Sequence, residues 1–264
     1  MSQFEGVLQK MITAYQKPIQ YYLSLDKHFL HVNQLLGKKI KIEFQKYQCL
    51  NCGSNKKIFR QGFCYDCFVE TPRAGEWIMK PELSKAHLGQ EDRDLAYEKK
   101  VQLQPHVVYL ANSSSVKVGV TRKSQIPTRW IDQGAHAAIQ FIETPNRYLA
   151  GIAEVALKKY VADKTNWRTM LKNDNKDEDL MAKVNELKPY LPDEVKAYLL
   201  KDEKEFLIDF PVERYPIKLK SLNLSKNPVF EDRLAGIKGQ YLIFENDVVF
   251  NVRNSEGFYV KISL

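Results

Sequence analysis

The four cysteines of this 264-residue chain constrain its fold more than any other feature, because all of them lie within 19 residues. They form two C-x-x-C pairs, Cys49-Leu-Asn-Cys52 and Cys64-Tyr-Asp-Cys67. Each pair can direct two thiolates from a tight turn onto one metal ion, and four sulfurs suit tetrahedral Zn²⁺. Gly53 permits the backbone turn that the first pair needs. The pattern predicts a zinc ribbon over residues 47–70, with these four cysteines as ligands.

Paired cysteines also serve as redox-active dithiols and as ligands of iron–sulfur clusters. Redox C-x-x-C motifs normally occur singly at the start of a helix, whereas this chain has two similar pairs. A disulfide framework is not expected in a reducing cytosol. We therefore expect structural zinc, and four protein ligands would leave this metal no open position for catalysis.

The overall composition indicates a folded, water-soluble protein. The chain is 27% charged and 44% hydrophobic, and no stretch approaches the roughly 18 consecutive apolar residues of a membrane span. The first residues lack the basic and apolar regions of a secretory signal. We expect a cytoplasmic protein without a membrane partner. The formal net charge of +8 permits a polyanionic partner without requiring one.

Hydrophobic periodicity predicts an α+β fold. Alternation at 39–44 and β-rich stretches at 19–25, 106–110 and 116–121 indicate strands, and 149–161 has the pattern of an amphipathic helix. The predicted division is an N-terminal β-region (1–46), the zinc ribbon (47–70), a connector (71–104), a small α/β core (105–172), a helical segment (173–205) and a C-terminal β-region (206–264) that pairs with the N-terminal one.

The two ends of the chain share a sequence pattern. The order of strand, turn, strand, glycine and strand over 22–42 recurs over 241–262, with one residue inserted at the turn. Unrelated hairpins can also produce this pattern, so the interpretation stays open. A true repeat predicts that the termini form one β-domain, into which the zinc and central segments are inserted.

Basic and aromatic residues are interleaved around the cysteine pairs. From residue 38 to residue 60 there are seven basic residues and one acid, with Tyr47, Phe59, Phe63 and Tyr65 among or beside them. This mixture suits phosphate contact with base stacking, although the aromatic residues also suit packing inside a small ribbon. The residues predicted to contact nucleic acid are Lys38, Lys39, Lys41, Lys56, Lys57 and Arg60, together with Arg122 and Lys123 of the central segment.

A set of residues in the central segment suggests chemistry when its members are considered together. Tyr109 ends one predicted strand and Lys117 lies on the next, while Arg129, Glu154 and Asn166 follow in order. Each alone has a structural explanation, such as packing for the tyrosine. Glu154, however, lies in a mostly apolar stretch, which is unusual for an exposed helix residue.

The order of these residues resembles that of the GIY-YIG nuclease superfamily over residues 105–172. Val107-Val108-Tyr109 stands where that superfamily has GIY, and Lys117-Val118-Gly119 stands where it has YIG. With the zinc ribbon, the chain resembles an uncharacterised bacterial family that carries such a core. Two departures are Val107 in place of the first glycine and Lys117 in place of the second tyrosine.

The resemblance implies metal-assisted hydrolysis of phosphodiester bonds. Glu154 would hold one Mg²⁺ or Mn²⁺, and Arg129 would bind the scissile phosphate. Tyr109 would orient or deprotonate the attacking water, and Lys117 would either assist it or act as the base. Asn166 would orient Glu154 or a phosphate, and Gly119 would be the motif glycine.

Three functions are therefore compatible with the sequence. The first is a divalent-metal-dependent endonuclease that acts on DNA or RNA. The second is a non-catalytic, zinc-containing protein that binds nucleic acid, and the third is a zinc-stapled scaffold for a protein partner.

Overall fold

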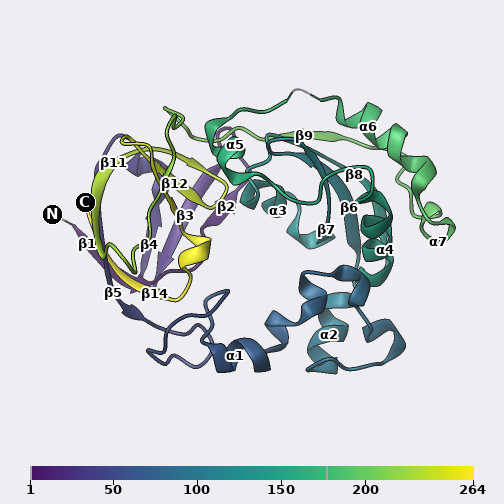
Figure 1. Ribbon diagram of the computed structural model, residues 1–264, viewed down its shortest axis with the longest axis horizontal. Coiled ribbons are helices and arrows are strands. Elements are labelled where there is room, and N and C mark those ends of the chain that lie inside the picture. The colour runs from purple at the N-terminus through teal and green to yellow at the C-terminus, as the bar shows by residue number, and fades with distance from the viewer. Residues whose placement is uncertain (1, 177) are drawn as a thin grey trace. The chain divides into compact units, whose positions relative to one another are not determined.

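The computed structural model describes residues 2–176 and 178–264 and confirms the α+β class (Figure 1). The chain divides into two compact units. The first consists of residues 1–69 and 209–264, and the second consists of residues 70–208. The finer six-part division stays a prediction. No helix among the described residues is long and apolar enough to cross a membrane.

The first unit is built from two β-sheets whose strands come from both ends of the chain. In Figure 1 these strands curve around a common interior. The interior contains large buried side chains such as Tyr21, Phe244 and Phe250. The larger sheet has the order β1 (Gln3–Val7), β14 (Phe258–Ser263), β5 (Lys39–Tyr47), β11 (Val229–Lys238), β12 (Tyr241–Phe244), β13 (Val248–Asn251) and β10 (Lys220–Ser221); the smaller has the order β2 (Ile12–Ala14), β3 (Gln20–Leu25) and β4 (His28–His31).

Two segments of this unit have the same order of elements. β3 and β4 are followed by a 3₁₀ turn (Val32–Leu35) and β5, while β12 and β13 are followed by a 3₁₀ turn (Arg253–Ser255) and β14. Gly37 and Gly257 follow the two turns with φ of 71° and 82°, a left-handed conformation that favours glycine. The inserted residue of the second segment lies between β12 and β13.

The strand pairing gives these two segments a local two-fold relationship. β5 and β14 are antiparallel, and Ile42 faces Ile262, its own equivalent in the repeat. β11 places Glu231 opposite Lys41 of β5, and β1 places Glu5 opposite Lys261 of β14. The equivalence therefore extends to β1 and β11, beyond the pattern visible in the sequence. The two segments therefore form a structural repeat within this unit.

The second unit contains an antiparallel sheet with the order β7 (Val116–Arg122), β6 (His106–Asn112), β8 (Ala137–Thr144) and β9 (Glu205–Leu207). Its apolar core joins this sheet to α4 (Arg147–Leu157) and α6 (Leu180–Leu187), which lie beside it in Figure 1. Shorter helices are α3 (Thr128–Asp132), α5 (Trp167–Lys172) and α7 (Asp193–Lys196).

The connector before this sheet consists of short turns that are fastened to α4. It contains 3₁₀ turns at Pro72–Ala74, Glu76–Ile78, Pro81–Leu83 and Ala86–Leu88, followed by α2 (Leu95–Gln102). The buried Arg147 of α4 donates hydrogen bonds to the carbonyl oxygens of Trp77 (3.1 Å) and Ile78 (2.8 Å). These bonds satisfy backbone groups of a segment that has little regular structure of its own.

Candidate functional site

The four cysteines lie together in the first unit and can hold a zinc ion. Their sulfur atoms all lie within 4.8 Å of one another, and no disulfide joins them. Cys49 and Cys52 flank a tight turn after β5. Cys64 and Cys67 are positioned by α1 (Tyr65–Glu70), whose first turn includes the bond from Phe68 N to the Cys64 carbonyl oxygen. Four sulfurs at this spacing match the ligand set of a structural zinc site.

Backbone and side-chain donors surround the sulfur atoms. Cys49 Sγ accepts hydrogen bonds from the backbone N–H groups of Asn51 (3.4 Å) and Cys64 (3.3 Å), and Cys67 Sγ accepts one from Asn51 Nδ2 (3.4 Å). A hydrogen bond to Ser54 lowers the pKa of the Cys52 thiol to about 6. The hydrogen bond from Asn51 lowers the pKa of the Cys67 thiol, but burial and the three neighbouring cysteines raise it to about 12. Thiolates are the metal-binding form, so binding of a metal ion would displace the thiol protons.

The motif residues of the central segment meet at the β6–β7 pair. Tyr109 of β6 lies directly opposite Gly119 of β7. A Cβ placed on Gly119 would lie 2.6 Å from the Tyr109 hydroxyl oxygen. The glycine is therefore required by the tyrosine ring that covers it.

Tyr109 is a buried phenol held by neighbours from α3 and the residue after it. It is 1% exposed, and its hydroxyl donates to Gln133 Oε1 at 3.1 Å. Burial raises the pKa of Tyr109, while Arg129 beside it acts in the opposite direction. The phenol is therefore protonated at neutral pH.

Lys117 is a buried amine whose charge is weakened by its surroundings. Its side chain is 4% exposed, and its ammonium group donates to Thr165 Oγ1. Burial and the positive charge of Arg129 lower the pKa of Lys117 to about 7, against the opposing effect of Asp163 and Glu154. A substantial fraction of this lysine is neutral near pH 7.

Glu154 is the carboxylate of this cluster, on the buried face of α4. Burial raises its pKa, and the positive charges of Lys158 and Arg147 oppose that effect. Lys158 Nζ lies 3.6 Å from Glu154 Oε2. The structure thus brings Tyr109, Lys117, Arg129 and Glu154 within electrostatic range of one another.

Asn166 caps a helix in the structure, and the role that the resemblance implies for it stays a prediction. Its side-chain oxygen accepts the backbone N–H groups of Arg168 (3.1 Å) and Thr169 (3.3 Å) and so caps the N-terminus of α5. Helix capping is a sufficient structural reason for an asparagine at position 166.

The basic residues predicted to contact nucleic acid are less concentrated in space than in sequence. Lys39 begins β5 and the cysteine ribbon follows its end, so the nine-residue strand separates them by roughly 25 Å. Acids pair with several of the predicted contacts: Lys39 with Glu231 (2.9 Å), Lys41 with Glu43 (3.0 Å), Lys56 with Asp66 (2.6 Å) and Lys123 with Glu143 (2.9 Å). Of the others, Lys38, Lys57 and Arg60 are exposed and Arg122 is half-buried.

Three residues near the motif cluster were missed by the sequence analysis. Arg147 is buried and lowers the pKa of Glu154, Gln133 accepts from Tyr109, and Thr165 accepts from Lys117. An arginine within the apolar run that contains Glu154 was the one available signal, because a buried cation needs partners.

These features define an α+β protein with a structural repeat in its β-unit, a four-cysteine metal site and a buried ionisable cluster in a second unit. The chain belongs to the family described as Protein of unknown function (DUF2797), whose characteristic sequence matches residues 37–260. No curated protein and no solved structure matched. Because none of these comparisons links the chain to the GIY-YIG nucleases, that resemblance stays a prediction.

Proposed function

We propose that this protein is a divalent-metal-dependent endonuclease whose active site is the cluster of Tyr109, Lys117, Arg129 and Glu154. The observation that supports it best is the meeting of these four residues, which come from β6, β7, α3 and α4. Burial shifts the pKa of three of them, and such shifts accumulate at functional sites.

Glu154 is the carboxylate that this proposal assigns to a hard cation, and Glu82 adds negative charge near it. One carboxylate with open coordination is how Mg²⁺ is commonly held, since this ion keeps most of its waters. Glu154 would hold the ion, which would supply charge stabilisation at the scissile phosphate. Arg129, which is half-buried, would bind a non-bridging phosphate oxygen through its planar guanidinium group.

The directions of the pKa shifts assign different proton-transfer roles to Tyr109 and Lys117. Tyr109 stays protonated, so its hydroxyl would orient the attacking water rather than deprotonate it. Lys117, with a pKa of about 7, can accept a proton near neutral pH and would be the general base. The base is therefore the lysine that replaces the second motif tyrosine.

Loss of cleavage in single variants tests this proposal. Glu154→Ala and Arg129→Ala are expected to lower Mg²⁺-dependent cleavage of labelled DNA or RNA by roughly 10²-fold or more, because each removes charge stabilisation at the phosphate. Glu194→Ala, which removes an exposed carboxylate of α7, is the matched control and should cleave like the wild type. Cleavage unchanged by Glu154→Ala, or no cleavage by the wild type, would refute the proposal.

A second candidate is a nucleic-acid-binding protein that does not cleave. The ion pair between Lys158 and Glu154 favours it, because a carboxylate already neutralised by an ammonium group has less need of a metal ion. Salt-dependent binding by the wild type without cleavage in Mg²⁺ or Mn²⁺ would select this function over the first.

A further inference from the structure

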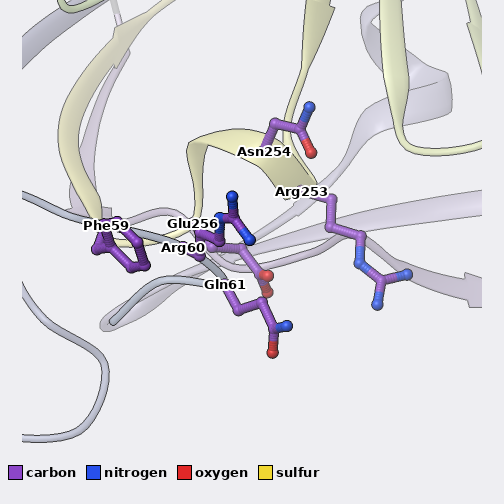
Figure 2. A pocket seen from close by; sticks show the side chains of 6 residues that line it. All are labelled: Phe59, Arg60, Gln61, Arg253, Asn254 and Glu256. Carbon is purple, nitrogen blue, oxygen red and sulfur yellow. The ribbon is translucent and has the colours of Figure 1, made fainter. Parts of the chain in front are cut away.

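An open pocket of about 380 Å³ lies between the zinc ribbon and the second turn of the structural repeat, inside the first unit. Figure 2 shows Phe59 and Arg253 at opposite sides of this pocket, with Gln61 between them at its edge. The volume falls within the range of small-molecule sites. The lining residues are Phe59, Arg60 and Gln61 of the ribbon, and Arg253, Asn254 and Glu256 of the turn before β14.

Close backbone contacts hold the two walls of this pocket together. A Cβ on Gly62 would lie 2.4 Å from Leu50 Cδ1 and 3.2 Å from Glu256 Cβ, and one on Gly257 would lie 2.7 Å from Ile58 Cδ1. The backbone hydrogen bond from Gln48 N to the Gly257 carbonyl oxygen (2.7 Å) connects the start of the ribbon to the same turn. These contacts pack the ribbon against the turn before β14, which together line the pocket.

The lining combines positive charge with an aromatic face. Arg60 and Arg253 supply two guanidinium groups, while Glu256 Oε1 accepts the backbone N–H of Lys10 at 3.0 Å. Phe59 is 47% exposed, and its ring makes edge contacts with Tyr65 and Phe68 at 5.3 and 5.2 Å. The Arg60 guanidinium group lies over this ring, 5.4 Å from its centroid, so the phosphate-binding group and the stacking surface adjoin. Guanidinium groups bind phosphate, and a fixed exposed ring is a stacking surface for a base.

The structural repeat supplies an internal comparison for this pocket. The repeat equivalent of Arg253 is Asn33, in the turn that follows β4. Asn33 has a structural role, because its side chain accepts from Tyr21 N and donates to the Ile19 carbonyl oxygen, both at 2.8 Å. The turn that lies against the ribbon thus has Arg253. The equivalent turn has Asn33, whose side chain bonds to the backbone at and just before β3.

We propose that this pocket binds one nucleotide of a single-stranded nucleic acid. Arg60 and Arg253 bind the phosphate, the base stacks on Phe59, and the amides of Gln61 and Asn254 face the base edge. The inference shares its substrate class with the proposed function but does not depend on cleavage. It also gives the metal site a purpose, because the ribbon fixed by the cysteines carries Phe59 and Arg60.

Binding of labelled oligonucleotides to the full zinc-loaded chain tests this proposal. All measurements use the Glu154→Ala background, so that failure of cleavage and failure of binding are separate results. Phe59→Ala is expected to weaken binding of a single-stranded oligothymidylate by about 10-fold, through loss of stacking. Arg253→Ala should weaken binding and lower the slope of log affinity against log salt by about 0.7.

Two controls distinguish binding of the oligonucleotide at this pocket from nonspecific electrostatic binding to the protein surface. Lys218→Ala removes an exposed cation near Asp247, at the other end of β13 from Arg253, and should leave the affinity unchanged. An abasic oligomer of the same length keeps the phosphates and should bind about 10-fold more weakly than the oligothymidylate.

Three results would overturn the proposal. They are wild-type affinity in Arg253→Ala, which lies outside the ribbon, equal affinity for the abasic oligomer, and equal weakening by Lys218→Ala. Measured zinc content identifies a Phe59→Ala variant whose ribbon is damaged, and Arg253→Ala then decides the question alone.

Discussion

At the scale of single residues, burial determines which groups of the central cluster can move a proton. Tyr109 and Lys117 lie on adjacent strands, and burial disfavours the charged form of each. The consequence is opposite for a phenol and an amine: the tyrosine keeps its proton to higher pH, whereas the lysine loses its proton at lower pH. The lysine is the residue that titrates near neutrality.

This difference predicts the pH dependence of cleavage. Lys117 is protonated below about pH 7 and neutral above it, so the rate should rise with pH and level off above that value. A divalent cation on Glu154 adds positive charge nearby and would lower the inflection, never raise it. Single-turnover rates measured across neutral pH test this expectation.

A lysine variant provides the matching control for the pH profile. Lys117→Arg keeps a positive charge that does not titrate, so it should cleave slowly at every pH. A rising profile with the same inflection in Lys117→Arg would show that another group is the base.

At the scale of elements, one glycine determines how the connector packs on α4. A Cβ on Gly151 would lie 2.3 Å from Glu82 N and 2.5 Å from the Pro81 carbonyl carbon. Both are backbone atoms, so neither can move away as a flexible side chain would. The helix accepts a poor helix former here because the connector approaches its backbone.

Gly151→Ala is therefore expected to destabilise the protein by about 1–3 kcal/mol, although alanine normally favours a helix over glycine. Equilibrium urea unfolding would measure the change. Val155→Ala, at an exposed position of the same helix, is the control and should change stability little. A Gly151→Ala variant more stable than the wild type would contradict the packing of the 3₁₀ turn at Pro81–Leu83 on α4.

At the scale of the whole molecule, the metal site and the buried cluster belong to different compact units. All four cysteines lie in the first unit, whereas the apolar core under α4 and α6 lies entirely in the second. Metal ligation stabilises the part of a chain whose folding assembles the ligands. The two units should therefore respond differently to loss of metal.

Zinc chelation is expected to increase hydrogen exchange in the ribbon, residues 47–69, and to leave the strands β6–β8 protected. Hydrogen exchange with mass spectrometry, before and after chelation, measures both regions. Cys49→Ser together with Cys64→Ser, which removes two buried ligands, should reproduce the effect without a chelator. Equal loss of protection in β6–β8 would show that the metal site supports the second unit as well.

The candidate zinc ligands could be predicted because the C-x-x-C spacing is a local feature of the sequence. A C-x-x-C pair places its two sulfurs on one turn, and the cysteine cluster in the structure agrees with that expectation. The α+β class was equally accessible, since a strand such as β3 alternates buried and exposed positions along a few residues.

Other features depend on contacts between distant parts of the chain. The ion pair of Lys39 with Glu231 was not visible in the sequence, because Glu231 approaches Lys39 only through the pairing of β11 with β5. The side chain of Asn166 satisfies free N–H groups at the start of α5, which depends on where that helix begins in the folded chain.

The sequence by itself determined the cysteine cluster that can hold a metal ion, the α+β class and the pattern shared by the two ends of the chain. Only the tertiary structure decided that Arg253 faces the zinc ribbon across a pocket, that Arg147 lies near Glu154, and that Lys117 loses its proton near pH 7. The physical reason is the distance along the sequence over which each kind of interaction acts. Ligand spacing and alternation act over a few residues, whereas burial and electrostatic surroundings exist only after distant segments have packed together.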